Sequence, residues 1–171
     1  ANRGAVDASI GTAMGIGDRG VWGGGYSAGL QTGLEYIAIG STGNAQDFGD
    51  LSNAMGYTGA CSSSSRGVFS AKLAIDYITI STTGNGSDFG DLSVQRDHPA
   101  GLGNNVRGLF GGGDGGTDVI DYITFASLSD ATDFGNLTDN SAGGAALASI
   151  TRGIFAGGQG SGTWAPANAD R

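Results

Sequence analysis

An internal repeat constrains the fold of this 171-residue chain more than any other feature of its sequence. Arg-Gly pairs begin at Arg19, Arg66, Arg107 and Arg152, which gives periods of 47, 41 and 45 residues. The first three are each followed by a tyrosine and then a phenylalanine, namely Tyr36 and Phe48, Tyr77 and Phe89, and Tyr122 and Phe134. The Tyr-to-Phe spacing is always 12 residues and the Phe-to-Arg spacing always 18, so only the Arg-to-Tyr segment varies, at 17, 11 and 15 residues. This pattern predicts a repeat architecture with a fixed frame and one variable loop per unit.

Composition and local patterns indicate that each unit consists of short β-strands. The chain has 35 glycines, and its 16 acidic residues include one Glu and its 8 basic residues one Lys. Glu and Lys are favoured on helix surfaces, so their scarcity argues against helices. In the second unit, residues 76–82 predict a strand, residues 83–85 a turn, and residues 87–92 another short strand. Residues 55–63 are small and apolar enough for a fourth strand, and three or four strands per unit is the size of a propeller blade.

The chain is predicted to be a single all-β repeat domain of about four units, three complete and one split between the termini. Residues 1–18 would be the end of a repeat, 19–65, 66–106 and 107–151 complete repeats, and 152–171 the start of a repeat. The two terminal parts together hold 38 residues, which is nearly one unit. Pairing of the two ends would close a ring of four units and protect its sheet edges. A fragment of a longer array, or a subunit of an oligomeric ring, is the alternative.

Charge and cysteine content exclude several classes of function. The net charge of −8 argues against nucleic-acid partners and anionic membrane surfaces, which both require clustered basic residues. No apolar run approaches the roughly 18 residues of a spanning helix, so membrane insertion is not expected. The lone Cys61 rules out an internal disulfide and a thiolate zinc site. Neither a metal nor a cofactor is expected.

Catalytic motifs are weak, and the chain is predicted not to be an enzyme. Residues 25–29 match the G-x-S-x-G motif, but no helix pattern follows them, and the only histidine, His98, is remote in sequence. The aspartate pairs Asp47/Asp50 and Asp88/Asp91 are interpreted as turn residues, with calcium binding as the alternative.

A recurring acidic residue suggests a structural role for the arginines of the Arg-Gly pairs. An acidic residue precedes each frame tyrosine, at Glu35, Asp76 and Asp121. Arginine suits buried bidentate pairs, so each arginine of an Arg-Gly pair is expected to bind one of these carboxylates.

The order of glycine runs, variable loop, acidic-Tyr strand and small-residue strand resembles the kelch repeat. The glycine runs are residues 23–25, 111–113 and 157–158, and the aromatic pairs are the Tyr and Phe residues of the frame. The kelch pattern usually has Trp in place of this Phe, and the second unit has Ser70-Ala71 in place of the glycines. The resemblance implies a kelch-like β-propeller. The sequence pattern I-D-Y-I-T-I-x-x-T-G-N-x-x-D-F-G-D-L resembles repeats of structural and tail-fibre-like proteins of tailed bacteriophages.

Function is expected on the variable loops, near residues 24–33, 71–74, 112–118 and 157–165. Aromatic and polar side chains there suit a glycan or a protein surface, and the candidate ligand-binding residues are Tyr26, Asp114, Asp118, Gln159 and Trp164. We expect a non-enzymatic fibre, decoration or adhesion protein of a phage virion, located on the virion or outside the cell. Its expected partners are other virion proteins, copies of itself, or a host-surface glycan. The alternatives are a soluble lectin-type propeller and a kelch-type interaction adaptor.

Overall fold

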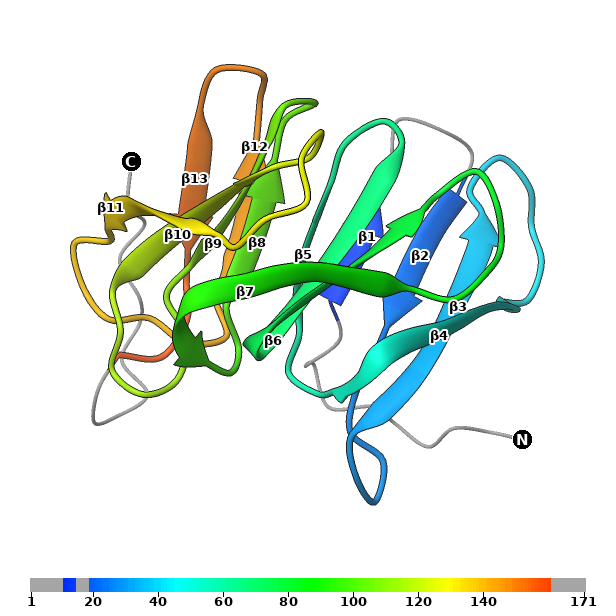
Figure 1. Ribbon diagram of the computed structural model, residues 1–171, viewed down its shortest axis with the longest axis horizontal. Helices are drawn as coiled ribbons and strands as arrows, with labels where there is room; N and C mark the ends of the chain where they lie inside the picture. The colour runs from blue at the N-terminus through cyan, green and yellow to red at the C-terminus, as the bar shows by residue number, and fades with distance from the viewer. Residues whose placement is uncertain (1–10, 15–18, 161–171) are drawn as a thin grey trace.

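The computed structural model describes residues 11–14 and 19–160, and these residues form thirteen β-strands (Figure 1). None of the described residues forms a helix long and apolar enough to cross a membrane. The strands are β1 (Gly11–Met14), β2 (Arg19–Gly23), β3 (Gln31–Ala38), β4 (Gln46–Met55), β5 (Gly59–Ser62), β6 (Arg66–Thr79), β7 (Ser87–Arg96), β8 (Ala100–Gly103), β9 (Arg107–Gly111), β10 (Val119–Thr124), β11 (Thr132–Asn136), β12 (Ala145–Ala148) and β13 (Gly153–Ala156).

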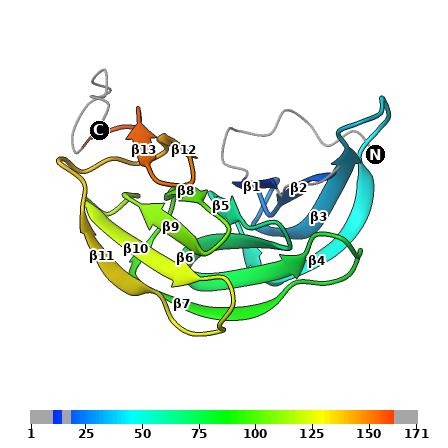
Figure 2. The ribbon, with the colours of Figure 1, turned by 90° about the horizontal axis from the view of Figure 1, so that it is seen from above.

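The strands form four antiparallel sheets, which we call blades 1 to 4. Their strand orders are β1-β2-β3-β4, β5-β6-β7, β8-β9-β10-β11 and β12-β13. Figure 2 shows the four blades side by side in an arc, with β1, β5, β8 and β12 on its inner side and β4, β7 and β11 on its outer side. The prediction of an all-β, propeller-like protein is therefore confirmed.

The predicted strands of the second unit lie in β6, β7 and β5, but the strand expected over residues 76–82 ends at Thr79, and residues 80–82 form the turn. The sheets are also out of phase with the Arg-Gly starts. Residues 59–62 form β5, which pairs with the following Arg66 strand and not with the preceding β4. A blade thus begins one strand before its Arg-Gly pair. The sequence frame cannot reveal this phase, because a repeat reads the same wherever its first residue is placed.

The variable segment is shortest in blade 2. There, the two strands that correspond to β2 and β3 of blade 1 are continuous and form the single element β6. Its ends meet, because the backbone N–H of Ile80 donates to the carbonyl of Ser65 at 2.9 Å. The chain reverses near Lys72, which has a left-handed φ of 57°. A two-strand hairpin with a tight reversal needs only the 11-residue spacing from Arg66 to Tyr77, whereas blades 1 and 3 carry longer loops.

The hydrophobic core lies between neighbouring blades. Between blades 1 and 2, buried residues of β2, β3 and β4 pack against Ile78 of β6 and Ile80, which directly follows β6. Between blades 2 and 3, the matching residues of β6 and β7 pack against Ile123 and Phe125. Each interface is therefore completed by two apolar residues that follow the frame tyrosine of the next blade.

Cys61 provides a probe of this core. It is buried in the cluster between blades 2 and 3, and burial raises the pKa of its thiol far above the usual value. Because the thiolate is the reactive form, we expect the native protein to resist thiol reagents and to become modified only on unfolding. Reaction with a chromogenic disulfide reagent across a urea series measures this, and rapid modification in the absence of urea would contradict it.

Candidate functional site

Buried carboxylates join each blade to the one before it. The Asp76 carboxylate of β6 accepts hydrogen bonds from the backbone N–H and hydroxyl of Ser52 in β4, at 2.6 and 2.7 Å. Asp121 of β10 accepts the same two bonds from Ser93 of β7, at 3.1 and 2.5 Å. Both aspartates are fully buried. These contacts fix the position of one blade relative to the next.

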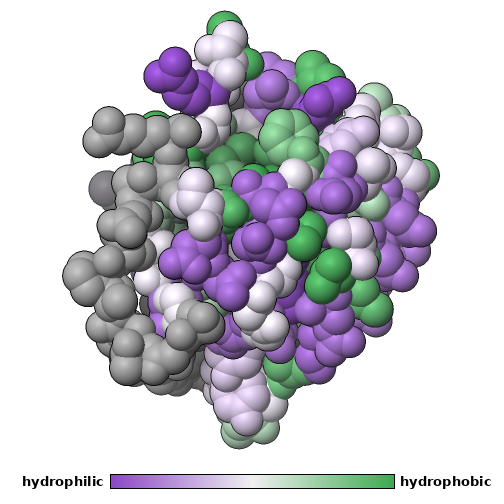
Figure 3. Space-filling view, turned by 90° about the vertical axis from the view of Figure 1, so that its left-hand side faces the viewer, coloured by the Kyte–Doolittle hydropathy of each residue, from purple (hydrophilic) through white to green (hydrophobic). Residues whose placement is uncertain are grey.

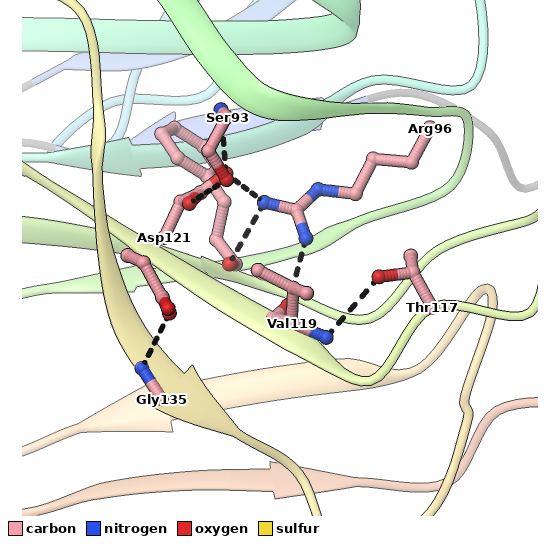
Figure 4. Close-up of polar contacts among 8 residues, drawn as sticks. Ser93, Arg96, Thr117, Val119, Asp121 and Gly135 are labelled. Atoms are coloured by element: carbon pink, nitrogen blue, oxygen red, sulfur yellow. Dashed lines mark hydrogen bonds and ion pairs between the residues drawn. The ribbon is translucent and has the colours of Figure 1, made fainter.

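Asp121 also forms an ion pair with Arg96, whose side chain is fully buried (Figure 4). The guanidinium donates in addition to the carbonyl of Val119 at 2.7 Å. Burial lowers the pKa of Arg96 from its usual value, and the Asp121 carboxylate opposes that shift. In blade 1 the corresponding frame position holds the buried Met55, so this pair belongs to one blade interface and not to the repeat.

The expected pairing of the Arg-Gly arginines with the acidic frame residues is wrong for Asp76 and Asp121. These carboxylates bind the preceding blade, whereas the guanidinium groups of Arg19, Arg66 and Arg107 lie over the rings of Tyr36, Tyr77 and Tyr122, 4.8–4.9 Å from the ring centroids. A cation is attracted to the face of a tyrosine ring, which explains the choice of partner. Arg19 also donates to the carbonyl of Ile80 at 3.0 Å, and Arg66 to that of Phe125, each in the next blade.

The Asp-Phe-Gly-Asp motifs lie in the outer strands β4 and β7 and not in turns, so their interpretation as turn residues is wrong. Asp50 accepts a hydrogen bond from the hydroxyl of Thr32 at 2.8 Å. The turn of blade 2 packs against β4, where the N–H of Gly84 donates to Phe48 O and Asn85 Oδ1 accepts from Asp50 N–H. A Cβ at Gly49 would stand 2.4 Å from the carbonyl oxygen of Gly84, so the motif needs glycine because the next blade approaches closely.

One frame position between blades has left-handed backbone in all three of its copies. It is occupied by Tyr57, His98 and Gly143, with φ of 58°, 58° and 66°. The N–H of His98 donates to Tyr57 O at 2.9 Å, and the N–H of Gly143 to His98 O at 3.0 Å. This chain of bonds from blade to blade holds the backbone in a conformation that is rare for bulky residues.

The side chains at this position form part of a continuous row, which we call the aromatic row: Tyr26, Tyr57, His98 and Asp114. The rings of Tyr26 and Tyr57 stack with centroids 6.0 Å apart, and those of Tyr57 and His98 are 4.3 Å apart. His98 Nδ1 lies 2.8 Å from Asp114 Oδ2. An ionised carboxylate only accepts, so Nδ1 carries the proton in this contact. Tyr26 and Asp114 come from the variable loops of blades 1 and 3.

The structure brings together three of the five residues predicted from the sequence. Asp114 and Gln159 line one pocket of about 160 Å³, together with Asn140, and Tyr26 joins Asp114 through the aromatic row. Asp118 is half-buried, and it lies outside that pocket lining. Trp164 lies outside the described residues.

Sequence reasoning missed Tyr57 and His98 as site residues. Both stand nine residues after the frame phenylalanine, and the third copy of that position is Gly143. The glycine in the third copy was the signal that could have marked this position as one with a positive φ, because glycine favours that conformation.

Ser27 of the G-x-S-x-G match lies in a bend beside the short Tyr26–Leu30 bridge, with no helix after it. Among the described residues, no three His, Cys, Asp or Glu side chains gather in a way that would hold a metal ion.

Comparisons with known proteins identify the fold. A scan against protein-family models and a search of the curated proteins each found no match. Among the solved structures, YjhT, a kelch-repeat β-propeller protein, matches with a TM-score of 0.68 at 14% identity, over 88% of this chain and 58% of its own. This chain thus spans less than two thirds of YjhT, and such low identity shows the fold alone. The chain has the fold of a kelch-like β-propeller, and its described residues form three blades and two strands of a fourth.

Proposed function

We propose that this protein is a non-enzymatic adhesion module of a phage virion that binds a surface glycan through the aromatic row. The observation that carries the proposal is the continuous arrangement of Tyr26, Tyr57, His98 and Asp114 across the loops of three blades. Aromatic faces pack on the C–H faces of sugar rings, while carboxylates and amides bind hydroxyl groups. The pocket beside Asp114 supplies amides from Asn140 and Gln159.

Backbone strain at the row supports a binding role. A bulky residue at positive φ costs of order 1–3 kcal/mol and persists only where the surroundings impose it. The third copy of the position has glycine, Gly143, which avoids that cost. Tyr57 and His98 therefore occupy a position where glycine would give a more stable backbone. The strained backbone is kept together with the stacked side chains that it places in the row. Such strain is concentrated at binding sites in other proteins.

Two features support the virion setting. The amino-acid sequence of the repeat resembles that of phage structural proteins. A surface nearly without Lys and Glu also suits a rigid β-protein that works outside a cell. Mass spectrometry of purified particles tests the setting. Recovery of the protein only from the lysate, and never from particles, would contradict it.

Tyr57→Gly should weaken glycan binding at least tenfold without lowering stability, because it removes the central ring of the row and relieves a strained backbone. A glycan array finds the ligand, and titration of the best binder with each variant measures the loss. Lys72→Gly is the matched control, since Lys72 has the same left-handed φ outside the row. An array without a binder, or a Tyr57→Gly variant that binds like the parent protein, would overturn glycan binding.

A further inference from the structure

The aromatic row ends on a carboxylate that the protein itself uses only in part. Asp114 Oδ2 bonds to His98 Nδ1, and Asp114 Oδ1 has no bonding partner among the described residues. The Asp114 side chain is 55% exposed, so a ligand can reach it. A carboxylate oxygen accepts strong hydrogen bonds from hydroxyl groups but has no proton to donate to another anion. The end of the row therefore favours a ligand with hydroxyl donors.

Three further carboxylates lie on the loops around Asp114. Asp97 lies between β7 and β8, and its carbonyl accepts a hydrogen bond from the N–H of Asp114 at 2.7 Å. Asp118 ends the variable loop that carries Asp114. Asp139 directly precedes Asn140, which lines the pocket beside Asp114. Asp97 and Asp118 are half-buried and Asp139 is exposed, so the surroundings of the row are acidic.

Basic side chains do not balance these carboxylates. The arginines of the Arg-Gly pairs lie at the starts of their strands, as Arg19 does in β2, whereas the variable loops of blades 1 and 3 follow the ends of β2 and β9, at the lower edge of Figure 1. A five-residue strand spans about 13 Å, which exceeds the Debye length of roughly 8 Å at physiological ionic strength. Arg96 lies nearer the row, but its guanidinium is buried in the pair with Asp121. Among the described residues, Lys72 is the one lysine or arginine at this end that is not paired with a carboxylate.

The pocket at this end of the row is polar. Asp114, Asn140 and Gln159 line it together with several glycines, and none of its described lining residues is apolar and larger than alanine. By contrast, on the side of blades 3 and 4 that Figure 3 shows, hydrophobic side chains lie in a recess bordered by polar ones. A ligand at the end of the row thus meets hydrogen-bonding groups and negative charge.

We propose that Asp114 makes the aromatic row selective for uncharged glycans, so that sugars with carboxylate, sulfate or phosphate groups are rejected; this selectivity rests on the glycan binding proposed above. The tyrosine rings pack on the C–H face of an uncharged or an acidic sugar alike, so they do not discriminate between the two. Like charges that face each other oppose association, and specificity is the resulting difference between two affinities. Asp114 is the specificity-determining residue, because its carboxylate is the one that lies in the row itself.

A glycan array that carries neutral oligosaccharides beside their sulfated and carboxylated forms tests the selectivity. We expect the protein to bind neutral members at least tenfold more tightly than the matching acidic ones. Asp114→Asn should lower this ratio at least threefold and bind neutral members normally, because asparagine keeps an oxygen that accepts from His98 but carries no charge. Asp47→Asn is the matched control, which should keep the ratio. It makes the same change on an exposed residue near the start of β4, whereas Tyr57 follows the end of that strand.

Salt provides a second measurement that needs no variant. Raising the ionic strength from about 0.01 M to about 1 M shortens the Debye length from about 30 Å to about 3 Å, so acidic members should gain affinity relative to neutral ones. If the protein binds an acidic member best, or if either salt or Asp114→Asn leaves the ratio unchanged, the selectivity is overturned while glycan binding stands. An array without a binder would overturn glycan binding itself, and the selectivity with it.

Discussion

Asp121→Ala is expected to lower the free energy of unfolding by about 3–5 kcal/mol, because it leaves the Arg96 guanidinium buried without its counter-charge. Asp76→Ala is the matched control. Asp76 occupies the same frame position and makes the same bonds to a serine of the preceding blade, but the frame position of Arg96 holds Met55 in that blade. Asp76→Ala loses hydrogen bonds alone, so it should lower the free energy of unfolding by about 1–3 kcal/mol. Urea unfolding of both variants measures the difference.

The double variant Arg96→Met with Asp121→Asn separates charge from packing. It copies the methionine of blade 1 and removes both buried charges together. Removal of both charges leaves no buried charge without its partner, so most of the lost stability should return. If Asp121→Ala costs no more than Asp76→Ala, or the double variant is as unstable as Asp121→Ala, the ion pair is not the source of the effect.

The strands and their repetition could be predicted from the sequence because they depend on local alternation. Residues 76–79 alternate buried and exposed or half-buried side chains in β6, and the invariant spacing from Tyr77 to Phe89 matches the pairing of β6 with β7. Arg96 could not be predicted in the same way. Its frame position holds Met55, Arg96 and Ser141 in the three units, so no repetition marks it.

The site was only partly predictable for a related physical reason. Tyr26, Asp114 and Gln159 lie in loops whose changing length marks them as surface features. Tyr57 and His98 enter the site through a left-handed backbone that bonds between blades impose. Such bonds join residues 41 and 45 positions apart, which no local pattern encodes. The partner of Asp76 was missed likewise, because Ser52 belongs to the preceding blade.

Phe89→Ala and Phe134→Ala should differ widely in cost although the two residues share one frame position. Each ring meets its frame tyrosine edge to face, with centroids 6.0 and 6.1 Å apart, so both variants lose the same aromatic pair, which contributes about 0.5–1.5 kcal/mol. Phe89 is also enclosed by blade 3, and its truncation leaves a cavity, for a total of about 3–5 kcal/mol. Phe134 is half exposed, so its truncation should cost about 1 kcal/mol.

The difference between the two losses in the free energy of unfolding measures what one blade contributes by covering the preceding blade. Equal losses for Phe89→Ala and Phe134→Ala would mean that the outer side of blade 3 is already covered. In that case the exposed position of Phe134 would have to be abandoned, while the aromatic row would stand on its own evidence.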